Sequence, residues 1–340
     1  MATGVSIEIL DLRHFAAPML RSVLDAEGEI WKQRLHWDYR TSCKLLMQYL
    51  DSHMLPGYAA LENGQVTGFA FCVYEETKAV IGDVFALGYQ AANSSPGAGS
   101  SEGNQTLASA HEIEQTLLRH LFETLTNSPH VDRIESQLLL HPSGAHASGF
   151  REAGFQVFRR LFMVQPLSHI SGQPRVELPS GLELRAWRDD DLPAAGQLIS
   201  EAYRDHPDSV INDQYRSVHG SQRFLYNIVR YSGCGMFAPQ VSHVVVNRHT
   251  KALAALVLGS RVSAQSGHIT QLCVHPSYRR HGLARMLLSV AAFHFLRQGA
   301  TEISLTVTES NVKAIDLYRS EGYQYAHTFD AAVWQRARFA

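Results

Sequence analysis

The sequence has little that would direct a chain out of the cytoplasm or onto a polyanion. Its formal charge is only −2 over 340 residues, without the excess of basic residues that nucleic acid or anionic lipid attracts. It contains no run of 18 apolar residues, and its start, MATGVSIEILDLRHF, lacks the basic and apolar regions of a secretory leader. We therefore expect a cytoplasmic protein that binds neither nucleic acid nor membranes.

Cysteine is also scarce and has no metal-binding arrangement. Four cysteines occur in the whole chain, with no C-x-x-C pair among them, and the histidines are frequent but unclustered in sequence. This spacing predicts no zinc site and no other metal. Reduced thiols in a cytoplasm are the simple interpretation. The four cysteines are Cys43, Cys72, Cys234 and Cys273.

The chain length fits two domains rather than one core. Residues 166–181, PLSHISGQPRVELPSG, are rich in proline, glycine and serine and show no apolar period, which indicates an exposed connection. We place the domains at 1–168 and 181–340, with a linker at 169–180. The apolar patterns after the linker alternate between strand and helix periods, which predicts a mixed α/β fold.

Two short matches indicate that the second half repeats the first. FREAGFQ (150–156) is similar to YRSEGYQ (318–324), and QVTGFAFCVY (65–74) is similar to KALAALVLGS (251–260). The two spacings differ by 18 residues, which an insertion in the first half explains. The Gly/Ser/Asn-rich tract at 91–110 is that insertion, and its composition predicts a mobile loop.

The stretch LCVHPSYRRHGLA (272–284) predicts an anion site. An apolar strand passes through His-Pro into two arginines, a glycine and the start of an amphipathic helix. The first N–H groups of such a helix are unpaired and carry the positive end of its dipole. Gly282 has no Cβ that would obstruct the approach of an anion. The inferred ligand is a phosphate or diphosphate.

The same stretch resembles the signature of the GNAT superfamily of acyl-CoA-dependent N-acyltransferases, R/Q-x-x-G-x-G/A. Arg279, Gly282 and Ala284 occupy its fixed positions, and ISLTVTESNVKAIDLYRSEGY (303–323) is similar to the second hallmark of the family. The resemblance covers residues 181–330. It implies two tandem GNAT-like domains, each with a mostly antiparallel central sheet flanked by helices.

The resemblance also implies where acetyl-CoA would bind as co-substrate. In such proteins the pyrophosphate lies on the amides of the signature loop, here 280–285, and the pantetheine arm runs beside the preceding strand like an added strand. Asn311 is at a position that contacts CoA in the family, and it also suits a helix N-cap. The implied cofactor-binding residues are Leu272, Cys273, Val274, Arg279, Arg280, His281, Gly282, Leu283, Ala284, Arg285 and Asn311.

Acyl transfer to an amine needs a proton for the leaving thiolate and a base for the amine. Tyr318 matches the tyrosine of the family that serves as the acid; the alternative is a tyrosine that only packs inward. His268 matches the position of a catalytic glutamate in the histone-acetylating branch. It could act as base, but a strand histidine satisfied by a neighbour, with a water chain as base, is also consistent with the sequence.

The remaining parts of the expected site are less specific. Cys273 is better explained as a small packing residue than as a nucleophile, because direct attack by the amine needs no covalent intermediate. The main-chain N–H of Cys273 or Leu272 would stabilise the oxyanion if this strand bulges as it does in the family.

The segment YRDHPDSVINDQY (203–215) lies where the family builds its acceptor pocket. Its carboxylates, Asp205, Asp208 and Asp213, could attract a cationic amine. Solvated loop carboxylates are the simpler interpretation.

The first half lacks these parts. It has no signature after IGDVFALGY, and Phe150, which has no proton to give, replaces the tyrosine. We expect an enzyme whose second domain moves an acetyl group from acetyl-CoA to a primary amine by direct attack. A non-catalytic acyl-CoA sensing or binding module is the alternative. The expected partners are acetyl-CoA and an amine acceptor, and a homodimer is left open.

Overall fold

The structure is a computed structural model that describes residues 7–88, 109–231 and 235–337. The Gly/Ser/Asn-rich tract expected to be mobile lies, up to residue 108, outside the described residues, as does Cys234. The chain divides into two compact units. Unit 1 comprises Met1–Leu35, Tyr39–Phe158 and Phe329–Ala340, and unit 2 comprises His36–Asp38 and Arg159–Thr328.

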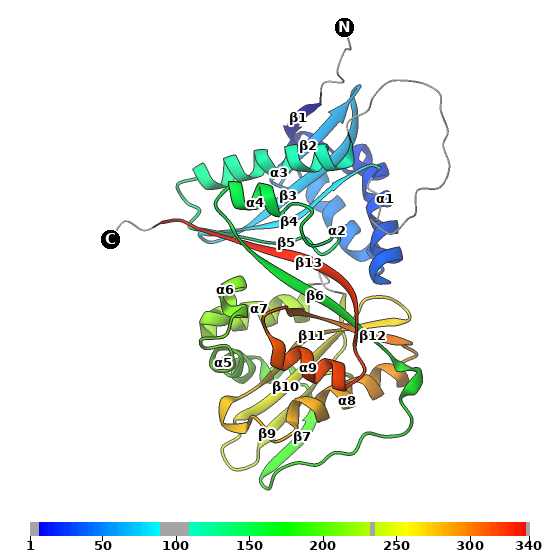
Figure 1. Cartoon of the computed structure of the whole chain (residues 1–340), viewed down its shortest axis with the longest axis vertical. Coiled ribbons are helices and arrows are strands. Elements are labelled where there is room, and N and C mark those ends of the chain that lie inside the picture. The colour runs from blue at the N-terminus through cyan, green and yellow to red at the C-terminus, as the bar shows by residue number, and fades with distance from the viewer. Residues whose placement is uncertain (1–6, 89–108, 232–234, 338–340) are drawn as a thin grey trace. The chain divides into compact units, whose positions relative to one another are not determined.

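Unit 1 is built on a sheet in the order β1-β2-β3-β4-β5-β13. Neighbouring strands are antiparallel except β4 and β5, which are parallel. Helices α3 and α4 lie on one face of this sheet, and α1 and α2 lie on the other (Figure 1). The elements are β1 (Glu8–Asp11), α1 (Ala17–Leu35), α2 (Arg40–Asp51), β2 (Gly57–Glu62), β3 (Gln65–Glu75), β4 (Lys78–Ala86), α3 (Ala110–Asn127), β5 (Arg133–Gln137) and α4 (Ala147–Glu152).

Unit 2 repeats this order as β7-β9-β10-β11-β12-β6, with β8 added beside β10. Its neighbouring strands are also antiparallel except for the parallel pair β11 and β12. The elements are β7 (Leu182–Ala186), α5 (Leu192–Ala202), α6 (Asp208–Ile211), α7 (Val218–Arg230), β8 (Met236–Phe237), β9 (His243–Asn247), β10 (Leu253–Arg261), β11 (Ser266–Val274), α8 (Leu283–Arg297), β12 (Glu302–Thr308) and α9 (Val312–Ser320).

Side-chain alternation along β10 explains why helices cover both faces of the unit 2 sheet. Ala255 and Val257 join the core under α8, whereas Leu256 and Leu258 join the core under α5 and α7. A central strand that is apolar on both faces has to be buried on both sides. The mixed, mostly antiparallel sheets flanked by helices, and the tandem repeat, are therefore confirmed.

Two strands run from one unit into the other. β6 (Gln156–Pro166) begins in unit 1, and its residues from Arg160 onward pair with β12 of unit 2. β13 (Gln324–Gln335) begins in unit 2, and its residues from Ala331 onward pair with β5 of unit 1. Each unit thus completes its sheet with the last strand of the other half of the sequence.

The units therefore differ from domains at 1–168 and 181–340. The first half contributes residues 159–168 and the short segment His36–Asp38 to unit 2, and the C-terminus belongs to unit 1. The expected linker at 169–180 lies within unit 2, where Ile170 and Leu178 pack against the core. Most of the other residues of the segment are exposed, as expected for a connection.

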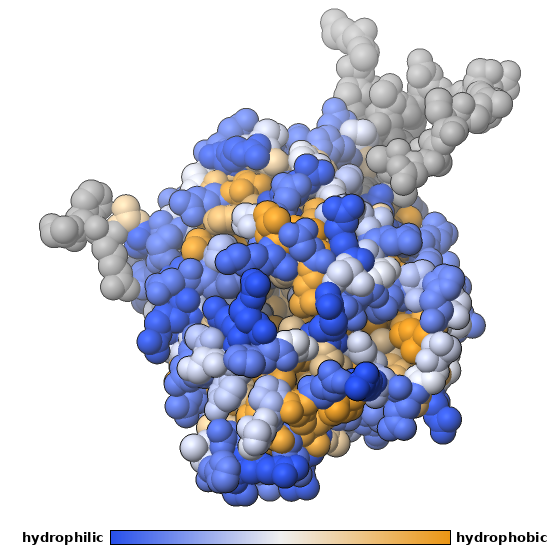
Figure 2. All heavy atoms as spheres, turned by 60° about the horizontal axis from the view of Figure 1, so that its bottom comes forward, coloured by the Kyte–Doolittle hydropathy of each residue, from blue (hydrophilic) through white to orange (hydrophobic). Residues whose placement is uncertain are grey.

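The described residues include no helix that is both long and apolar enough to cross a membrane. On the face drawn in Figure 2, hydrophilic residues surround separate groups of hydrophobic ones.

Candidate functional site

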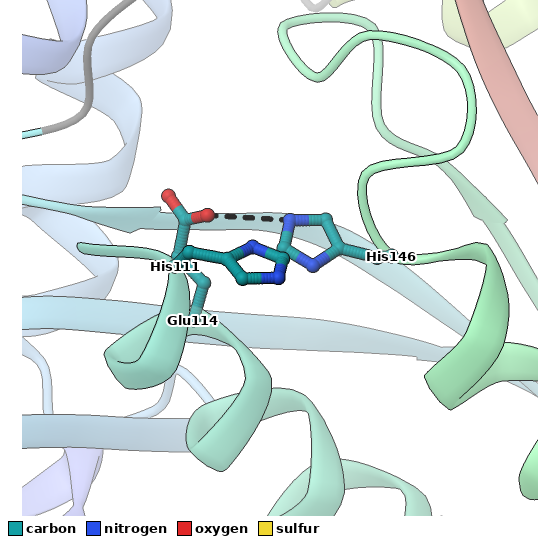
Figure 3. Close-up of side chains that lie close together, drawn as sticks. All are labelled: His111, Glu114 and His146. Carbon is teal, nitrogen blue, oxygen red and sulfur yellow. Dashed lines mark ion pairs between the residues drawn. The ribbon is translucent and has the colours of Figure 1, made fainter. Parts of the chain in front are cut away.

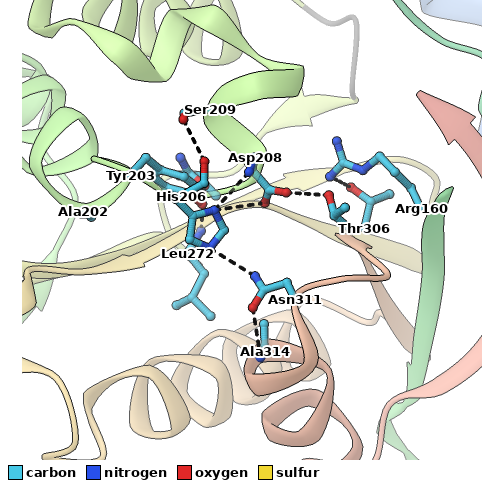
Figure 4. A network of polar contacts seen from close by, with 12 residues as sticks. Arg160, Ala202, Tyr203, His206, Asp208, Ser209, Leu272, Thr306, Asn311 and Ala314 are labelled. Atoms are coloured by element: carbon cyan, nitrogen blue, oxygen red, sulfur yellow. Dashed lines mark hydrogen bonds and ion pairs between the residues drawn. The ribbon is translucent and has the colours of Figure 1, made fainter. Parts of the chain in front are cut away.

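The candidate site in unit 2 is a wedge between two strands that separate. The parallel pairing of β11 and β12 runs from Ser266 and Glu302 to Ile269 and Leu305, although β11 continues to Val274 and β12 to Thr308. Beyond the last pair, side chains from α5, from the segment after it and from the start of α9 meet between the strands (Figure 4). An extended ligand can therefore use main-chain groups of β11 in this region.

A β-bulge in β11 lies at the point where the strands separate. Leu258 of β10 faces Gln271, and the next residue, Gly259, faces Ile269, so Thr270 is the extra residue. The irregularity expected in this strand is confirmed. The N–H of Leu272 donates to the side-chain Oε1 of Gln271 at 3.2 Å, and the hydroxyl of Tyr203 donates to the same oxygen at 3.1 Å. The Leu272 amide is thus held by a side chain that a ligand carbonyl could replace.

The loop after β11 has the conformation of an anion site. Arg280 and Gly282 both have left-handed backbone conformations, with φ of 69° and 75°. Gly282 is the N-cap of α8, and no side chain caps the helix there. The first amides of α8 therefore have no side-chain acceptor, which leaves them for a phosphate.

Arg279 also has partners within the protein. Its guanidinium donates to the carbonyl of Ala202 at 2.7 Å and to that of Val274 at 3.4 Å. These bonds tie the loop to the ends of α5 and β11. Arg279 thus supports the shape of the phosphate loop while it remains exposed.

Two further loop residues have their own partners. Arg285 pairs with Glu321 at 2.7 Å and donates to the hydroxyl of Ser320 at 2.8 Å, which links α8 to the end of α9. The ring of His281 contacts the carbonyl of Arg279 at 2.9 Å. The basic residues of the loop are all exposed, namely Arg279, Arg280, His281 and Arg285.

Tyr318 lies on α9 and packs against the core of unit 2. Burial raises the pKa of Tyr318 above its ordinary value, and the nearby charge of Asp208 raises that pKa further. The hydroxyl is therefore protonated at neutral pH, as an acid for a departing thiolate must be. Asn311 caps α9 through a bond from the N–H of Ala314 at 3.3 Å, which confirms the N-cap interpretation.

His268 lies in a buried aromatic setting in the paired part of β11. Its Nδ1 contacts the Ser304 hydroxyl at 2.9 Å, and its ring lies edge-on to Trp37 and parallel to Phe162. Ser304 donates its own proton to the carbonyl of Gly267, so it accepts from His268. Burial lowers the pKa of His268 to about 3. This is the satisfied strand histidine that the sequence left as an alternative.

Cys273 fits the expected packing role. It is buried in the core under α5 and α7, and burial raises the pKa of its thiol. The thiol therefore stays protonated and a poor nucleophile at neutral pH.

Asp208 is not the solvated loop carboxylate that the sequence favoured. Its Oδ1 accepts a hydrogen bond from the Thr308 hydroxyl at the end of β12, and its side chain is largely buried. His206 lies beside it and contacts the amide of Asn311 at 3.3 Å (Figure 4). Asp205, by contrast, is exposed.

Sequence reasoning missed Tyr203 and His206, which stand at the wedge with Asp208. Each of the three lies far along the chain from β11 and β12, and no spacing rule connects them. Their only signal was membership of the segment 203–215, where an acceptor pocket was expected.

Unit 1 has the same wedge, filled with its own side chains. Its strands β4 and β5 pair only from Lys78 and Arg133 to Ile81 and Ser136, and Gly82 is the extra residue opposite β3. Since Gly82 corresponds to Thr270, Val84 corresponds to Leu272. The N–H of Val84 donates to the Asp83 carboxylate at 2.8 Å, where unit 2 has the neutral amide of Gln271.

Other main-chain groups of the unit 1 wedge are also occupied. Nε2 of His141 contacts the carbonyl of Val84 at 2.8 Å, and the N–H of Ala86 donates to Glu114 at 3.3 Å. Burial lowers the pKa of His141 to about 4. Phe150, at the place of Tyr318, is buried among Phe122 and Phe155. The groups that would bind a pantetheine arm in unit 1 are therefore bonded within the protein.

Comparison with known proteins agrees with this geometry. Residues 198–323 match the model of the acetyltransferase (GNAT) family. A mycothiol acetyltransferase of Geodermatophilus obscurus is 27% identical over 180 residues, which cover 52% of this chain and 55% of the relative. One of Thermobispora bispora is 27% identical over 156 residues, covering 44% and 49%. The chain spans about half the length of these curated relatives.

Solved structures resemble the whole chain. A GCN5-related N-acetyltransferase from Sphaerobacter thermophilus has a TM-score of 0.62 at 15% identity and covers 98% of this chain and 97% of its own. A tandem GNAT protein from the clavulanic acid biosynthesis pathway has a TM-score of 0.57 at 14% identity, covering 98% and 100%. At such identities the likeness shows a shared fold across both units.

Proposed function

Because residues 198–323 form a domain of the GNAT acetyltransferase family, we propose that unit 2 transfers an acetyl group from acetyl-CoA to a primary amine by direct attack. The observation that carries the proposal is the wedge beside Leu272, where, beyond the last β11–β12 pair, a strand amide bonds to a side chain near an uncapped helix N-terminus. Diphosphate on α8 and pantetheine along Leu272, Cys273 and Val274 would bring the thioester to this amide. The name of the curated relatives supports acetyl as the group transferred.

The Leu272 amide supplies the oxyanion donor in this proposal. The thioester oxygen displaces Oε1 of Gln271 and accepts the Leu272 N–H, whose direction the bulge has already set. A preorganised donor costs no rearrangement when negative charge develops on the oxygen. Gln271 and Tyr203 remain beside the reacting carbon and exclude water.

Tyr318 supplies the proton of the leaving group. The neutral amine attacks the thioester carbon and forms the C–N bond. Collapse of the oxyanion then breaks the C–S bond, and the CoA thiolate takes the hydroxyl proton of Tyr318. The proton lost by the amine nitrogen restores the tyrosine through water. Each group thus ends the cycle in its starting state.

We place the acceptor amine beside Asp208 and His206. A buried carboxylate attracts a cationic amine into the wedge, because charges interact more strongly away from bulk water. The base is not assigned to His268, because its ring is buried beside Trp37 and Phe162 and its Nδ1–H is bonded to Ser304. A water chain beside Asp208 and His206 relays that proton to bulk solvent instead.

Turnover decides between an enzyme and an acyl-CoA binding module. Purified full-length protein is incubated with acetyl-CoA and a panel of primary amines, and free CoA is detected through its thiol. We expect amine-dependent CoA release. Binding of acetyl-CoA without release by any amine in the panel would favour the binding module.

Tyr318→Phe then tests the mechanism. It keeps the ring and removes the proton, so kcat should fall by about 10²–10⁴-fold while the dissociation constant of acetyl-CoA changes less than about tenfold. Tyr325→Phe is the matched control, because Tyr325 is an exposed tyrosine beyond α9. Near-normal turnover of Tyr318→Phe, with chemistry shown to be rate-limiting, would make Tyr318 a packing residue.

A further inference from the structure

Unit 1 contains a cluster of three histidines and a glutamate that the acetyltransferase mechanism does not use. His111 and Glu114 lie about one turn apart near the start of α3, and His146 faces them from the segment between β5 and α4 (Figure 3). His141 lies in the same segment and contacts His146. Residues three apart on a helix share one face. Two parts of the chain distant in sequence therefore present metal-ligand side chains to one point.

The distances within the cluster fit a tetrahedral ion. Glu114 Oε2 lies 3.2 Å from His146 Nε2, His146 Nε2 lies 3.3 Å from His141 Nδ1, and His141 Nδ1 lies 3.7 Å from Glu114 Oε2. Ligands about 2.0–2.1 Å from a zinc ion in a tetrahedron are about 3.3–3.4 Å from one another. These three atoms therefore have the spacing of one face of such a site.

His111 lies close enough to supply a fourth ligand, although its Nε2 contacts the Gln115 side chain at 2.8 Å here. Its ligand atom and those of Glu114 and His146 all lie within 4.8 Å of one another, and its ring stacks on that of His146 at 5.3 Å. His111 is exposed, whereas the other residues of the cluster are buried. The site would thus open to solvent on the side of His111, which gives an ion its path of entry.

Main-chain groups of β4 bond to His141 and Glu114 and fix their orientation, as groups around a metal site do for its ligands. His141 directs Nε2–H at the Val84 carbonyl, so its Nδ1 is the acceptor that faces Glu114 and His146. The Ala86 N–H holds Oε1 of Glu114 and leaves Oε2 toward the histidines. A second bond of this kind fixes the tautomer and orientation of metal ligands in proteins.

The charge of the cluster also calls for a cation. Glu114 is only 1% exposed, and a carboxylate so deeply buried needs a positive partner. Imidazoles with one carboxylate suit zinc and related transition metals, whereas calcium and magnesium prefer oxygen ligands.

We propose that unit 1 binds one divalent transition-metal ion, zinc by its ligand chemistry, through Glu114, His141 and His146 with His111 as the fourth ligand. The spacing of the four residues in sequence matches no zinc pattern, which is why the sequence predicted no metal. The ion ties α3 to β4 and to the segment before α4, in the wedge that the other unit uses for its cofactor. Its role is therefore to hold unit 1 together.

Cobalt(II) is the probe, because tetrahedral cobalt absorbs visible light strongly and reports its ligands. Tag-free, full-length protein is treated with a chelator, dialysed and titrated with Co²⁺, and bound Zn²⁺ is measured separately by elemental analysis. We expect one equivalent of either ion per chain, a visible cobalt spectrum that zinc abolishes, and a higher melting temperature with zinc.

Three variants and one control assign the site. His146→Ala and Glu114→Gln should abolish the cobalt spectrum and the zinc-dependent rise in melting temperature. His130→Ala, an exposed histidine of the same unit, should change neither. Because buried substitutions can disturb folding, His111→Ala supplies the exposed test: cobalt affinity should fall by about tenfold or more, as expected when metal coordination is weakened.

The outcomes separate a metal site from an ion pair. An unchanged spectrum in His111→Ala together with a lost one in His146→Ala supports a site in which water replaces His111. No uptake by the wild-type protein, or equal uptake by all variants, overturns the proposal. The 3.2 Å contact of Glu114 with His146 would then be a side-chain contact without a metal. Acetyl-CoA turnover enters none of these measurements, so the result is independent of the proposed function.

Discussion

At the scale of single residues, one substitution separates the two wedges. The amide after each bulge is held by the side chain before it, which is Gln271 in unit 2 and Asp83 in unit 1. Burial raises the pKa of Asp83 to about 6, so near neutral pH much of it carries negative charge. A carboxylate beside the oxyanion position repels the charge that the reaction develops, whereas an amide does not.

Gly282 sets the conformation of the proposed phosphate loop, and Gly282→Ala tests it. Its φ is +75° and a Cβ would meet nothing within 4 Å, so the variant should fold at a cost of about 1–2 kcal/mol in backbone strain. A methyl group in the path of the diphosphate should raise the dissociation constant of CoA about tenfold or more, because charge-assisted hydrogen bonds contribute about 1.5–3 kcal/mol. Calorimetry measures this change.

The matched control is Gly299→Ala at the other end of α8. Gly299 has φ of +84° and the same open space, so the variant carries the same strain away from the loop. Both variants should lose similar stability, and only Gly282→Ala should lose affinity. Equal affinity in the two variants would move the anion site elsewhere.

His268 should make the stability of unit 2 depend on pH. Its pKa is about 3 in the folded protein and 6.5 ordinarily, so between these values the unfolded chain binds more protons. The free energy of unfolding should therefore fall as the pH falls from about 6.5 towards 3. His268→Asn, which retains a donor for Ser304, should reduce this slope.

Urea unfolding at a series of pH values measures the effect. His249→Asn is the control, because His249 is exposed. A slope that is the same in His268→Asn and in the wild-type protein would mean that His268 is not held neutral by burial.

Local sequence predicted the residues that act through local conformation. Gly282 and Asn311 follow from turn and cap chemistry within a few residues, whereas the bulge in β11 was expected only from the family resemblance. Tyr203, His206 and Asp208 could not be assigned to the wedge in this way, because tertiary packing brings them to β11 and β12. The metal-ligand cluster around Glu114 was missed for the same reason.

At the scale of elements, the sequence predicts which segments are strands more readily than it predicts which strands pair with one another. The apolar pattern of β6 and β13 indicates extended chain, but period-two alternation carries no information on which strand lies alongside. The repeat suggested that each half keeps its own last strand. The structure instead gives the last part of β6 to β12 and the last part of β13 to β5.

Met163→Ala tests the role of β6 in unit 2. Met163 is fully buried and pairs with Leu305 of β12, so truncation leaves a cavity that costs about 2–5 kcal/mol. Hydrogen exchange followed by mass spectrometry should show faster exchange in peptides from β12. Met236→Ala on β8 is the control, because Met236 is 67% exposed. Unchanged exchange in β12 would mean that β6 contributes little to unit 2.

At the scale of the whole molecule, two similar units should offer one cofactor site. In unit 1 the Val84 N–H and carbonyl and the Ala86 N–H are bonded to Asp83, His141 and Glu114. In unit 2 the corresponding Leu272 amide is held only by a neutral side chain beside an uncapped helix. A ligand would have to break more bonds in unit 1, one of them to a carboxylate, and would find no signature loop.

Calorimetric titration of the full-length protein with CoA should therefore give one equivalent per chain. CoA is preferred to acetyl-CoA because it cannot turn over during the measurement. The intact chain is required, because a fragment cut in the expected linker would lose the part of β6 that pairs with β12. Gly282→Val should remove the heat of binding, since a branched Cβ obstructs the loop as well as straining it.

Two other results would contradict the prediction of a single CoA site in unit 2, and each would have a different explanation. Two equivalents would show that CoA displaces His141 and Glu114 from β4, so that the bonds in the unit 1 wedge are weaker than its burial implies. One equivalent that survives Gly282→Val would place the site outside the loop of unit 2. One equivalent of CoA that Gly282→Val abolishes would mean that both units share a fold but only unit 2 has a cofactor groove. The reason is that a main-chain group can bond either to a ligand or to the protein itself, but not to both.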